Sequence, residues 1–277
     1  MMFLLILLLS LPASTNAGIY QWQDSNGSRH YSDRASAGAI PIDIKPGYGY
    51  SRVKTVYDGD TLVLEDGRKI RLLGINTPEV AHRNQPADAG GEEAKQWLID
   101  KLKNTAVRLE TSAEKTDKYG RTLAHVFTEN KDHINLQLVE AGLASVNLYP
   151  PNLLYAKALV AAEEQAQQAG RGLWQRPEYA PIPVAAFSAA NYPGYQWRRL
   201  TGNVTGLRDT RKFVYLEFSR QFDVRIERQW LPLFTDLNGY VGKMLEVRGW
   251  LNRSKGHTSM LIRHPSAIKI VSEKNAP

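Results

Sequence analysis

Two aspartates flank a single glycine in the stretch Tyr57-Asp58-Gly59-Asp60-Thr61. Residues two apart in an extended chain point to the same side, so Asp58 and Asp60 would repel each other unless a cation lay between them. Oxygen ligands of this kind suit Ca²⁺ or Mg²⁺ rather than a soft metal. A turn between two strands also explains Asp58-Gly59, and these two residues alone favour that simpler interpretation.

Two further stretches add the other groups that a phosphodiester-cleaving site needs. The segment RLLGINTPE places Arg71, Asn76, Thr77 and Glu79 around one turn, and TDKYGR ends on Arg121. Arginine forks bind phosphate oxygens, acids hold a hard cation, and a spare acid can act on water. Taken singly, Arg71 and Glu79 are explained by a surface ion pair, and Arg121 by a polar hairpin loop. Taken together, the three stretches predict metal-assisted attack of water on a phosphodiester.

Strand-like and helix-like segments surround these residues between positions 51 and 176. Hydrophobic residues alternate in the segments RVKTVY, TLVLE, KIRLLG, AVRLE and RTLAHVF, which predicts strands. Helical spacing runs from Glu92 to Lys103 and through HINLQLVEAGLA and LLYAKALVAAEEQAQQAG. Strands followed mainly by helices predict an α+β, mainly β fold, in which a small barrel packs against three helices.

The motifs DGDT, RLLGINTPE and TDKYGR, followed by a helix that ends in GLW, occur in that order. This arrangement resembles the staphylococcal nuclease (thermonuclease) family over about residues 51–176. The resemblance implies an OB-fold nuclease barrel with three helices. It also implies a role for each residue that matches a family motif.

The implied roles fall into three groups. The resemblance implies metal binding by Asp60 and by the Thr77 carbonyl, with Asp58 as an acidic neighbour. It implies catalysis by Glu79, which would activate or orient water, and by two arginines that would bind phosphate and stabilise charge. The implied catalytic residues are therefore Arg71, Glu79 and Arg121. The resemblance implies substrate binding by Lys118 and Tyr119 and, in a loosely aligned stretch, by Tyr149.

Asn76 departs from the family pattern. It aligns with the second metal-binding aspartate of the family, and an amide oxygen ligates calcium without contributing charge. We therefore expect Ca²⁺ as cofactor, with Mg²⁺ or Mn²⁺ as alternatives. The departure also favours a second hypothesis, a non-catalytic nucleic-acid-binding protein with a degenerate nuclease site.

The N-terminal residues predict export. Residues 1–17 contain an apolar run that is too short to span a bilayer, followed by small residues up to Ala17. We interpret them as a signal peptide, with an uncleaved anchor as the alternative, and expect a periplasmic or extracellular protein without a stable membrane anchor. The sequence has no cysteine, which excludes disulfides and a cysteine nucleophile.

Residues 18–50 predict a small β-hairpin module and linker. Two short aromatic segments flank Asn26-Gly27, a strong hairpin turn signal. The W-x-D-x-x-G-x-x-H-Y-S-D pattern resembles a short N-terminal domain of unknown function seen on exported bacterial proteins. A proline-rich stretch, residues 177–194, predicts a second linker.

Residues 195–277 predict a basic OB-like β-barrel. Their order is three strands, a short helix near residues 229–237, and two strands. From residue 191 onward the chain has 15 Lys+Arg and 7 Asp+Glu, which indicates a polyanionic partner. Nucleic acid is the first candidate, ahead of an anionic membrane or a solubilising surface. Aromatic residues in this region suit single strands, although they could equally form its core: Phe213, Tyr215, Phe218 and Trp250.

The sequence as a whole predicts an exported, metal-dependent nuclease. We expect it to hydrolyse DNA and RNA, to prefer single strands and to act as an endonuclease, and the resemblance implies 3′-phosphate products. No protein partner is predicted. A surface-adhesion protein is a third hypothesis, which composition alone supports.

Overall fold

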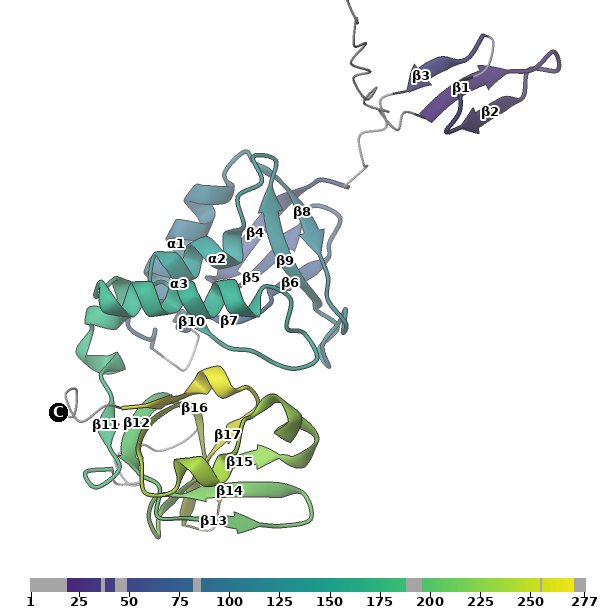
Figure 1. Cartoon of the computed structure of the whole chain (residues 1–277). Helices are drawn as coiled ribbons and strands as arrows, with labels where there is room; N and C mark the ends of the chain where they lie inside the picture. The colour runs from purple at the N-terminus through teal and green to yellow at the C-terminus, as the bar shows by residue number, and fades with distance from the viewer. Residues whose placement is uncertain are drawn as a thin grey trace, which may run out of the picture. The chain divides into compact units, whose positions relative to one another are not determined.

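A computed structural model describes residues 19–35, 38–42, 49–81, 86–187, 196–254 and 256–271 (Figure 1). The chain forms two compact units, residues 1–49 and 50–277. The signal peptide predicted at residues 1–17 lies outside the described residues. Among the described residues, no helix has the length and apolar character needed to cross a membrane.

The N-terminal unit is a three-stranded antiparallel sheet. Strand β1 (Ile19–Gln23) pairs with β2 (Arg29–Ser32) on one side and with β3 (Ile40–Ile42) on the other. The Asp24 carboxylate accepts hydrogen bonds from the backbone amides of Asn26 and Ser28, and Gly27 takes a positive φ of 81°. The predicted β-hairpin is therefore present, and β3 extends it.

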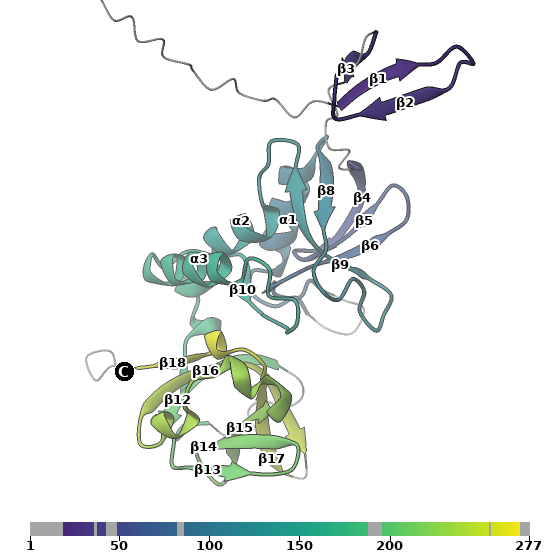
Figure 2. The ribbon, with the colours of Figure 1, turned by 45° about the vertical axis from the view of Figure 1, so that its right-hand side comes forward.

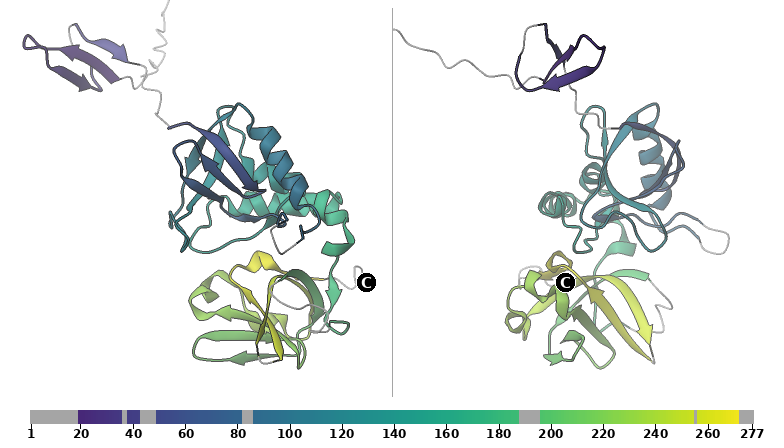
Figure 3. Two further views of the ribbon diagram at one scale, coloured as in Figure 1. Left: turned by 180° about the vertical axis from the view of Figure 1, so that it is seen from behind. Right: turned by 90° about the vertical axis from the view of Figure 1, so that its right-hand side faces the viewer.

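The second unit begins with a closed five-stranded barrel. Its strands are β4 (Ser51–Asp58), β5 (Thr61–Leu64), β6 (Lys69–Leu72), β8 (Ala106–Glu110) and β9 (Thr122–Thr128), in the order β4-β5-β6-β9-β8. The pair β6 and β9 is parallel, and the other neighbours are antiparallel. The predicted OB-fold barrel is confirmed, and the right-hand view of Figure 3 shows its strands curving into a ring.

Three α-helices lie beside this barrel, as predicted. They are α1 (Gly91–Leu102), α2 (Ile134–Glu140) and α3 (Ala156–Gln168), and Figure 2 shows α2 and α3 next to each other beside the strands. Leu98 of α1, Leu138 of α2 and Leu159 of α3 are fully buried with Leu62 and Ile70 of the barrel. A short ladder between β7 (Ile75–Asn76) and β10 (Ser145–Val146) ties the turn after β6 to the segment after α2.

A second curved sheet follows in the same unit. Its strands are β11 (Ile182–Pro183), β12 (Gln196–Asn203), β13 (Gly206–Asp209), β14 (Phe213–Glu217), β15 (Phe222–Glu227), β16 (Met244–Ser254), β17 (His257–Ile262) and β18 (Ile268–Ile270). They run in the order β11-β12-β16-β17-β15-β14-β13, with β18 on β16. Only Val204 and Thr205 separate β12 from β13, and β15 pairs with β17 in parallel. Taken as one bent strand, β12 and β13 give this domain the strand order of the first barrel.

Two segments of the C-terminal region differ from the sequence-based expectation. The helix expected near residues 229–237 is a pair of 3₁₀ turns, η3 (Arg228–Leu233) and η4 (Leu237–Tyr240). Pro232 lies inside η3 and lacks the amide hydrogen that an α-helix needs. The stretch predicted as a linker contains η2 (Pro177–Tyr179) and β11, and its Val184 and Phe187 are buried in the second core.

Candidate active site

Asp60 occupies the turn between β4 and β5, next to Arg71 of β6. The register of β5 and β6 places Thr61 opposite Arg71. One Asp60 oxygen, Oδ2, accepts a hydrogen bond from the Thr77 amide at 2.9 Å and lies 3.0 Å from Arg71 Nη2. The other oxygen, Oδ1, accepts from Thr61 Oγ1 at 3.1 Å. Asp58 is part of the same turn, because its Oδ1 accepts from the Asp60 amide at 2.9 Å.

Asn76 joins this group through the same arginine. Arg71 Nη2 donates to Asn76 Oδ1 at 3.3 Å, and Asn76 Nδ2 donates to the Thr77 carbonyl at 3.0 Å. The fold therefore brings Asp58, Asp60, Arg71, Asn76 and Thr77 into one connected cluster. Four of these five were predicted as metal ligands or their neighbour, and the fifth as a phosphate-binding arginine.

The electrostatics of the cluster centre on Asp60. Burial raises the pKa of the Asp60 carboxyl above its ordinary value, the nearby charge of Asp58 acts in the same direction, and the Arg71 guanidinium opposes both. A buried carboxylate is stable in the charged form only when a cation or hydrogen-bond donors compensate it. In this structure Arg71 and the Thr77 amide supply that compensation.

The donor atoms of the cluster fit a hard divalent cation. They are a carboxylate oxygen of Asp60, an amide oxygen of Asn76 and a carbonyl oxygen of Thr77, all of the type that Ca²⁺ and Mg²⁺ prefer. The described residues contain no group of three or more His, Cys, Asp or Glu side chains that could hold a metal. Because Arg71 contacts both Asp60 and Asn76, a cation bound there would share these oxygens with Arg71 or displace it.

Two glycines set how closely the segment from Thr77 to Glu79 approaches α1 and the β4–β5 turn. A Cβ on Gly59 would lie 2.7 Å from Ala94 Cβ of α1 and from Thr77 Cγ2. A Cβ on Gly91, the first residue of α1, would lie 2.3 Å from the carbonyl oxygen of Glu79. Any larger residue at Gly91 would therefore push the segment that carries Glu79 away from the helix.

Arg121 belongs to a second group, in the loop before β9. Asp117 Oδ2 accepts from Arg121 Nε at 2.7 Å, and Asp117 Oδ1 accepts from the amides of Tyr119 and Arg121 at 2.9 Å. Burial acts against ionisation of Asp117, but these hydrogen bonds outweigh it and lower its pKa. Lys118 Nζ lies 4.9 Å from the centre of the exposed Tyr119 ring. The loop thus presents three predicted substrate-contacting groups together.

The pairing of β6 with β9 relates the two groups of residues. Ile70 lies opposite Thr122, so Arg121 immediately precedes the strand that neighbours the strand of Arg71. Of the two predicted catalytic arginines, Arg71 accordingly lies on β6 and Arg121 lies directly before its neighbour β9.

Tyr149 lies in a third loop. Asn152 and Glu114 exchange two hydrogen bonds, of 2.8 and 3.0 Å, which tie this loop to the one that continues to Lys118 and Tyr119. The guanidinium of Arg263, from the C-terminal domain, lies 4.6 Å from the centre of the Tyr149 ring. A cation at this distance from an aromatic ring is attracted to it.

The sequence model of the family described as "Staphylococcal nuclease homologue" matches residues 69–176. A thermonuclease of Staphylococcus intermedius is 39% identical over 127 residues, which cover 45% of this chain and 75% of that protein. This chain belongs to the staphylococcal nuclease family. The expected class of enzyme, a hydrolase that acts on phosphodiester bonds, is confirmed by this membership.

Two further relatives and a second family model also match this chain. A thermonuclease of Staphylococcus hyicus is 37% identical over 126 residues, 44% of this chain and 74% of that protein. Endonuclease YncB of Bacillus subtilis is 28% identical over 194 residues, 64% of this chain and 92% of that protein. A "Domain of unknown function (DUF4124)" matches residues 6–89, which confirms the resemblance of the N-terminal module.

Three residues around the nuclease site were not singled out from the sequence. Asp117 could have been found, since its spacing of four from Arg121 lets the two side chains meet across a short turn. Asn152 and Arg263 carried no local signal, because their partners Glu114 and Tyr149 lie 38 and more than 100 positions away in the chain.

Proposed function

We propose that this chain is an exported nuclease that cuts DNA and RNA within the strand in a divalent-metal-dependent reaction and leaves 3′-phosphate ends. The observation that carries the proposal is the contact of Arg71 with Asp60 and Asn76 beside Thr77. Two motifs separated in sequence supply acidic, amide and guanidinium groups at one place, and Glu79 follows Thr77 by two residues.

The protein groups divide the chemistry among them. Glu79 accepts a proton from the attacking water or orients it toward phosphorus. Arg71 and Arg121 donate to the phosphate oxygens and stabilise the charge that accumulates on them in the transition state. Asp117 holds the Arg121 side chain in place through the 2.7 Å hydrogen bond to Nε.

Asp60, Asn76 and the carbonyl of Thr77 are the groups that would hold the cation, with Asp58 next to them. Ca²⁺ is the proposed ion, and Mg²⁺ or Mn²⁺ are alternatives because Asn76 adds no charge. When bound, the ion supplies positive charge that polarises a phosphate oxygen. Asn76 keeps an oxygen ligand at this position, which supports an active rather than a retired site.

Substrate contacts extend from this site. Lys118 and Tyr119 would contact a phosphate next to the one that is cleaved, and Tyr149 would stack against a base. The basic C-terminal domain would hold the same strand, and two tethered contacts raise the effective concentration of substrate at the site. Single strands are the proposed preferred substrate, because their bases are open to stacking.

The test is cleavage of labelled single-stranded and double-stranded DNA, and of RNA, by the chain without residues 1–17. We expect cutting in Ca²⁺, Mg²⁺ or Mn²⁺ and none in EDTA. Glu79→Gln should reduce the rate by about 10²-fold or more, whereas the control Glu129→Gln, at an exposed turn after β9, should retain it. Binding without cleavage under every metal, with cleavage restored by Asn76→Asp, would instead establish a binding protein with a degenerate site.

Export and product chemistry have separate tests. N-terminal sequencing of protein recovered from the periplasm or the medium should begin at Gly18, and sequencing that begins at Met1 or Met2 would contradict a cleaved signal peptide. Removal of a 3′-phosphate by a phosphatase should be required before the products can be extended by a polymerase.

A further inference from the structure

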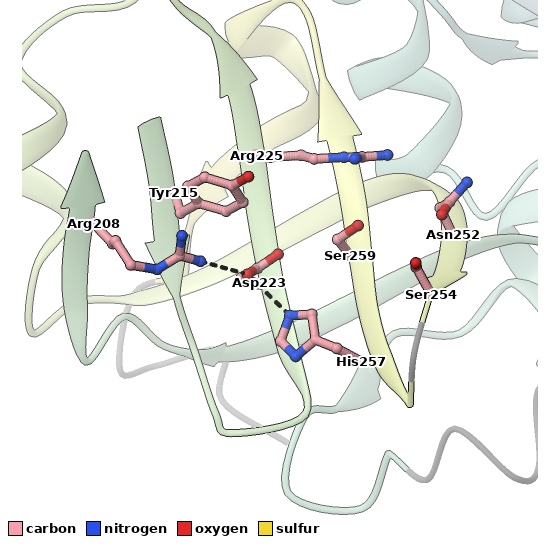
Figure 4. A pocket seen from close by; sticks show the side chains of 8 residues that line it. All are labelled: Arg208, Tyr215, Asp223, Arg225, Asn252, Ser254, His257 and Ser259. Carbon is pink, nitrogen blue, oxygen red and sulfur yellow. Dashed lines mark hydrogen bonds and ion pairs between the residues drawn. The ribbon is translucent and has the colours of Figure 1, made fainter. Parts of the chain in front are cut away.

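A pocket of about 320 Å³ lies on the outer face of the C-terminal sheet (Figure 4). Five side chains from four strands meet there: Arg208 of β13, Tyr215 of β14, Asp223 and Arg225 of β15, and Ser259 of β17. His257, the first residue of β17, lines the same pocket. None of these residues falls within the part of the chain that matches the nuclease family.

The strand register explains why polar groups gather on this face. Arg208 lies opposite Tyr215, Tyr215 lies opposite Arg225, and Asp223 lies opposite Ser259. Side chains alternate along a strand, so the intervening residues of β15 point into the core instead. These are Phe222, Val224 and Ile226, each fully buried.

Asp223 is a buried acid with one oxygen paired and one oxygen unpaired. Its Oδ2 lies 3.1 Å from Arg208 Nη2 and 2.9 Å from His257 Nε2. Its side chain is 5% exposed, and its Oδ1 accepts no hydrogen bond from the described residues. Burial raises the pKa of the Asp223 carboxyl, against the opposing charges of His257 and Arg208. A buried acceptor left without a donor is unfavourable, so this oxygen calls for a donor from outside the described residues.

Arg225, two residues further along β15, carries an unpaired hydrogen-bond donor instead. Its Nε is buried and donates no hydrogen bond to the described residues. The pocket therefore offers an unpaired acceptor and an unpaired donor on one face. A phosphate or sulfate ion carries mainly acceptors and would be repelled by Asp223, and a metal cation would be repelled by Arg208 and Arg225.

A planar group that carries both donors and acceptors satisfies both requirements. The Watson–Crick edge of each nucleobase combines them, and in a duplex that edge is already occupied by the paired base. The pocket also has a stacking surface, because the Arg208 guanidinium lies 3.8 Å from the centre of the Tyr215 ring and the Arg208 side chain is 45% exposed. Guanidinium planes and aromatic rings are the surfaces on which unpaired bases stack.

We propose that this pocket binds one unpaired nucleobase of a single-stranded nucleic acid, with Asp223 accepting a hydrogen bond from the base and Arg225 donating one to it. The inference rests on the proposed nuclease function and names a second contact for the same substrate. An adjoining pocket of about 460 Å³ shares Arg208, Asp223 and His257 and adds Arg220. It provides space and a cation for the neighbouring nucleotide.

The direction in which one substitution changes the binding affinity distinguishes base binding from simple charge attraction. In Asp223→Asn, the amide oxygen would face the donors Arg208 and His257, so its NH₂ group would face the pocket in place of an acceptor. If the face only attracted phosphates, loss of a negative charge would tighten binding. If Asp223 accepts a hydrogen bond from a base, the same substitution weakens it.

The experiment measures fluorescence anisotropy in EDTA, with the full chain carrying Glu79→Gln so that no strand is cut. The probes are a 12-nucleotide single-stranded DNA, an abasic strand of the same length, and the matching duplex. Asp223→Asn should weaken binding of the base-containing strand about tenfold and leave binding of the abasic strand unchanged or slightly tighter. The control Asp209→Asn, at the exposed end of β13, should not weaken either strand.

The proposal would be overturned if Asp223→Asn bound both strands more tightly, as expected for the mere loss of a negative charge, and so behaved like the control Asp209→Asn. If Asp223→Asn fails to fold, Arg225→Gln replaces it and should weaken the base-containing strand more than the abasic strand. Its control Arg228→Gln, on an exposed arginine, should weaken both equally. An equal loss for both strands in Arg225→Gln would overturn the proposal as well.

Cleavage by the parent chain is measured in parallel with divalent metals. Base-dependent binding without cleavage would remove the proposed nuclease activity and leave the base pocket standing. Cleavage without base-dependent binding would do the reverse.

Discussion

The two β-domains of residues 50–277 share a strand order but differ in which part of the sheet remains polar. In the first barrel, three α-helices cover part of the structure, and the polar cluster of Asp60, Arg71 and Asn76 lies in the β4–β5 turn and near the ends of β6 and β7. In the second domain, the described residues contain 3₁₀ turns but no α-helix, and the polar pocket around Asp223 lies on the outer face of the strands.

This difference shows that strand order does not by itself determine where chemistry is located. Turns can bring backbone carbonyls, amides and carboxylates together, which suits a cation and a phosphate. An uncovered strand face presents side chains in rows, which suits a planar base. The following predictions test whether the two domains serve these two purposes separately. They run from the largest expected change in free energy to the smallest.

The largest effect is expected at a buried ion pair between the domains. Glu163 of α3 and Arg248 of β16 form a buried ion pair, with side chains 1% and 4% exposed. Glu163→Gln should reduce the free energy of unfolding by about 3–5 kcal/mol, because it leaves Arg248 charged and buried without its partner. Urea denaturation followed by circular dichroism measures this change.

Its control is Glu164→Gln, next in sequence and about half exposed in its pair with Lys269, which should change stability by less than about 1 kcal/mol. A change below about 1 kcal/mol in Glu163→Gln as well would mean that the two domains are stable without this contact.

The second prediction asks whether bond cleavage is confined to the first barrel. Arg71→Ala should lower the cleavage rate at saturating substrate by about 10²–10³-fold, the usual loss for one charge-stabilising donor. The matched control Arg228→Ala removes an exposed arginine of the second domain and should leave that rate intact. Retention of more than a tenth of the parent rate in Arg71→Ala would exclude a catalytic role for this arginine.

The third prediction concerns acid stability of the first barrel. Burial lowers the pKa of His125 and of His133 to about 4, and the two rings lie 3.0 Å apart, from His125 Nδ1 to His133 Nε2. A histidine with a folded pKa below its unfolded value of about 6.5 binds its proton more readily in the unfolded chain. The resulting stability is complete above pH 6.5 and is lost as pH falls toward 4.

We expect each histidine to contribute a fall of about 3 kcal/mol in the free energy of unfolding over this range, at about 1.4 kcal/mol for each pKa unit. Urea denaturation at pH 4, 5, 6 and 7 measures the slope, and His125→Gln should flatten it. An unchanged slope in His125→Gln would assign the acid sensitivity to other groups.

The fourth prediction concerns the Asn76 position. Asn76→Asp adds a charged ligand, so the Ca²⁺ concentration for half-maximal cleavage should fall about tenfold, as expected when ligand charge increases. A calcium titration of cleavage measures the shift, with Asn104→Asp, at an exposed turn after α1, as the matched control. An identical calcium requirement in the parent and Asn76→Asp would place the ion away from Asn76.

The smallest effect is expected at another contact between the two domains, that of Arg263 with Tyr149. Arg263→Ala removes the cation beside Tyr149 and should change KM by roughly two- to fivefold without a change in kcat. Lys243→Ala, at an exposed position before β16, serves as control. An effect on kcat instead of KM would mean that Arg263 acts on the reacting groups.

Local patterns in the sequence predicted most of the fold. The Asn26-Gly27 turn, the three helices and the alternating strand FDVRIER are all present, because each depends on neighbours a few residues apart. The prediction of a short helix near residues 229–237 was wrong, because Pro232 restricts this segment to 3₁₀ turns. Among the aromatic residues predicted to bind nucleic acid, Phe218 is buried in the core, whereas Phe213 and Tyr215 lie on the outer face.

The sequence by itself determined which residue types are available for phosphodiester chemistry and in what order they occur, since motif spacing survives in the linear chain. Only the tertiary structure decided that Arg71 bridges Asp60 and Asn76, that Arg263 reaches Tyr149, and that Asp223 is buried with one oxygen unpaired. These facts depend on strand register and on contacts between distant segments, and no short stretch of sequence encodes them.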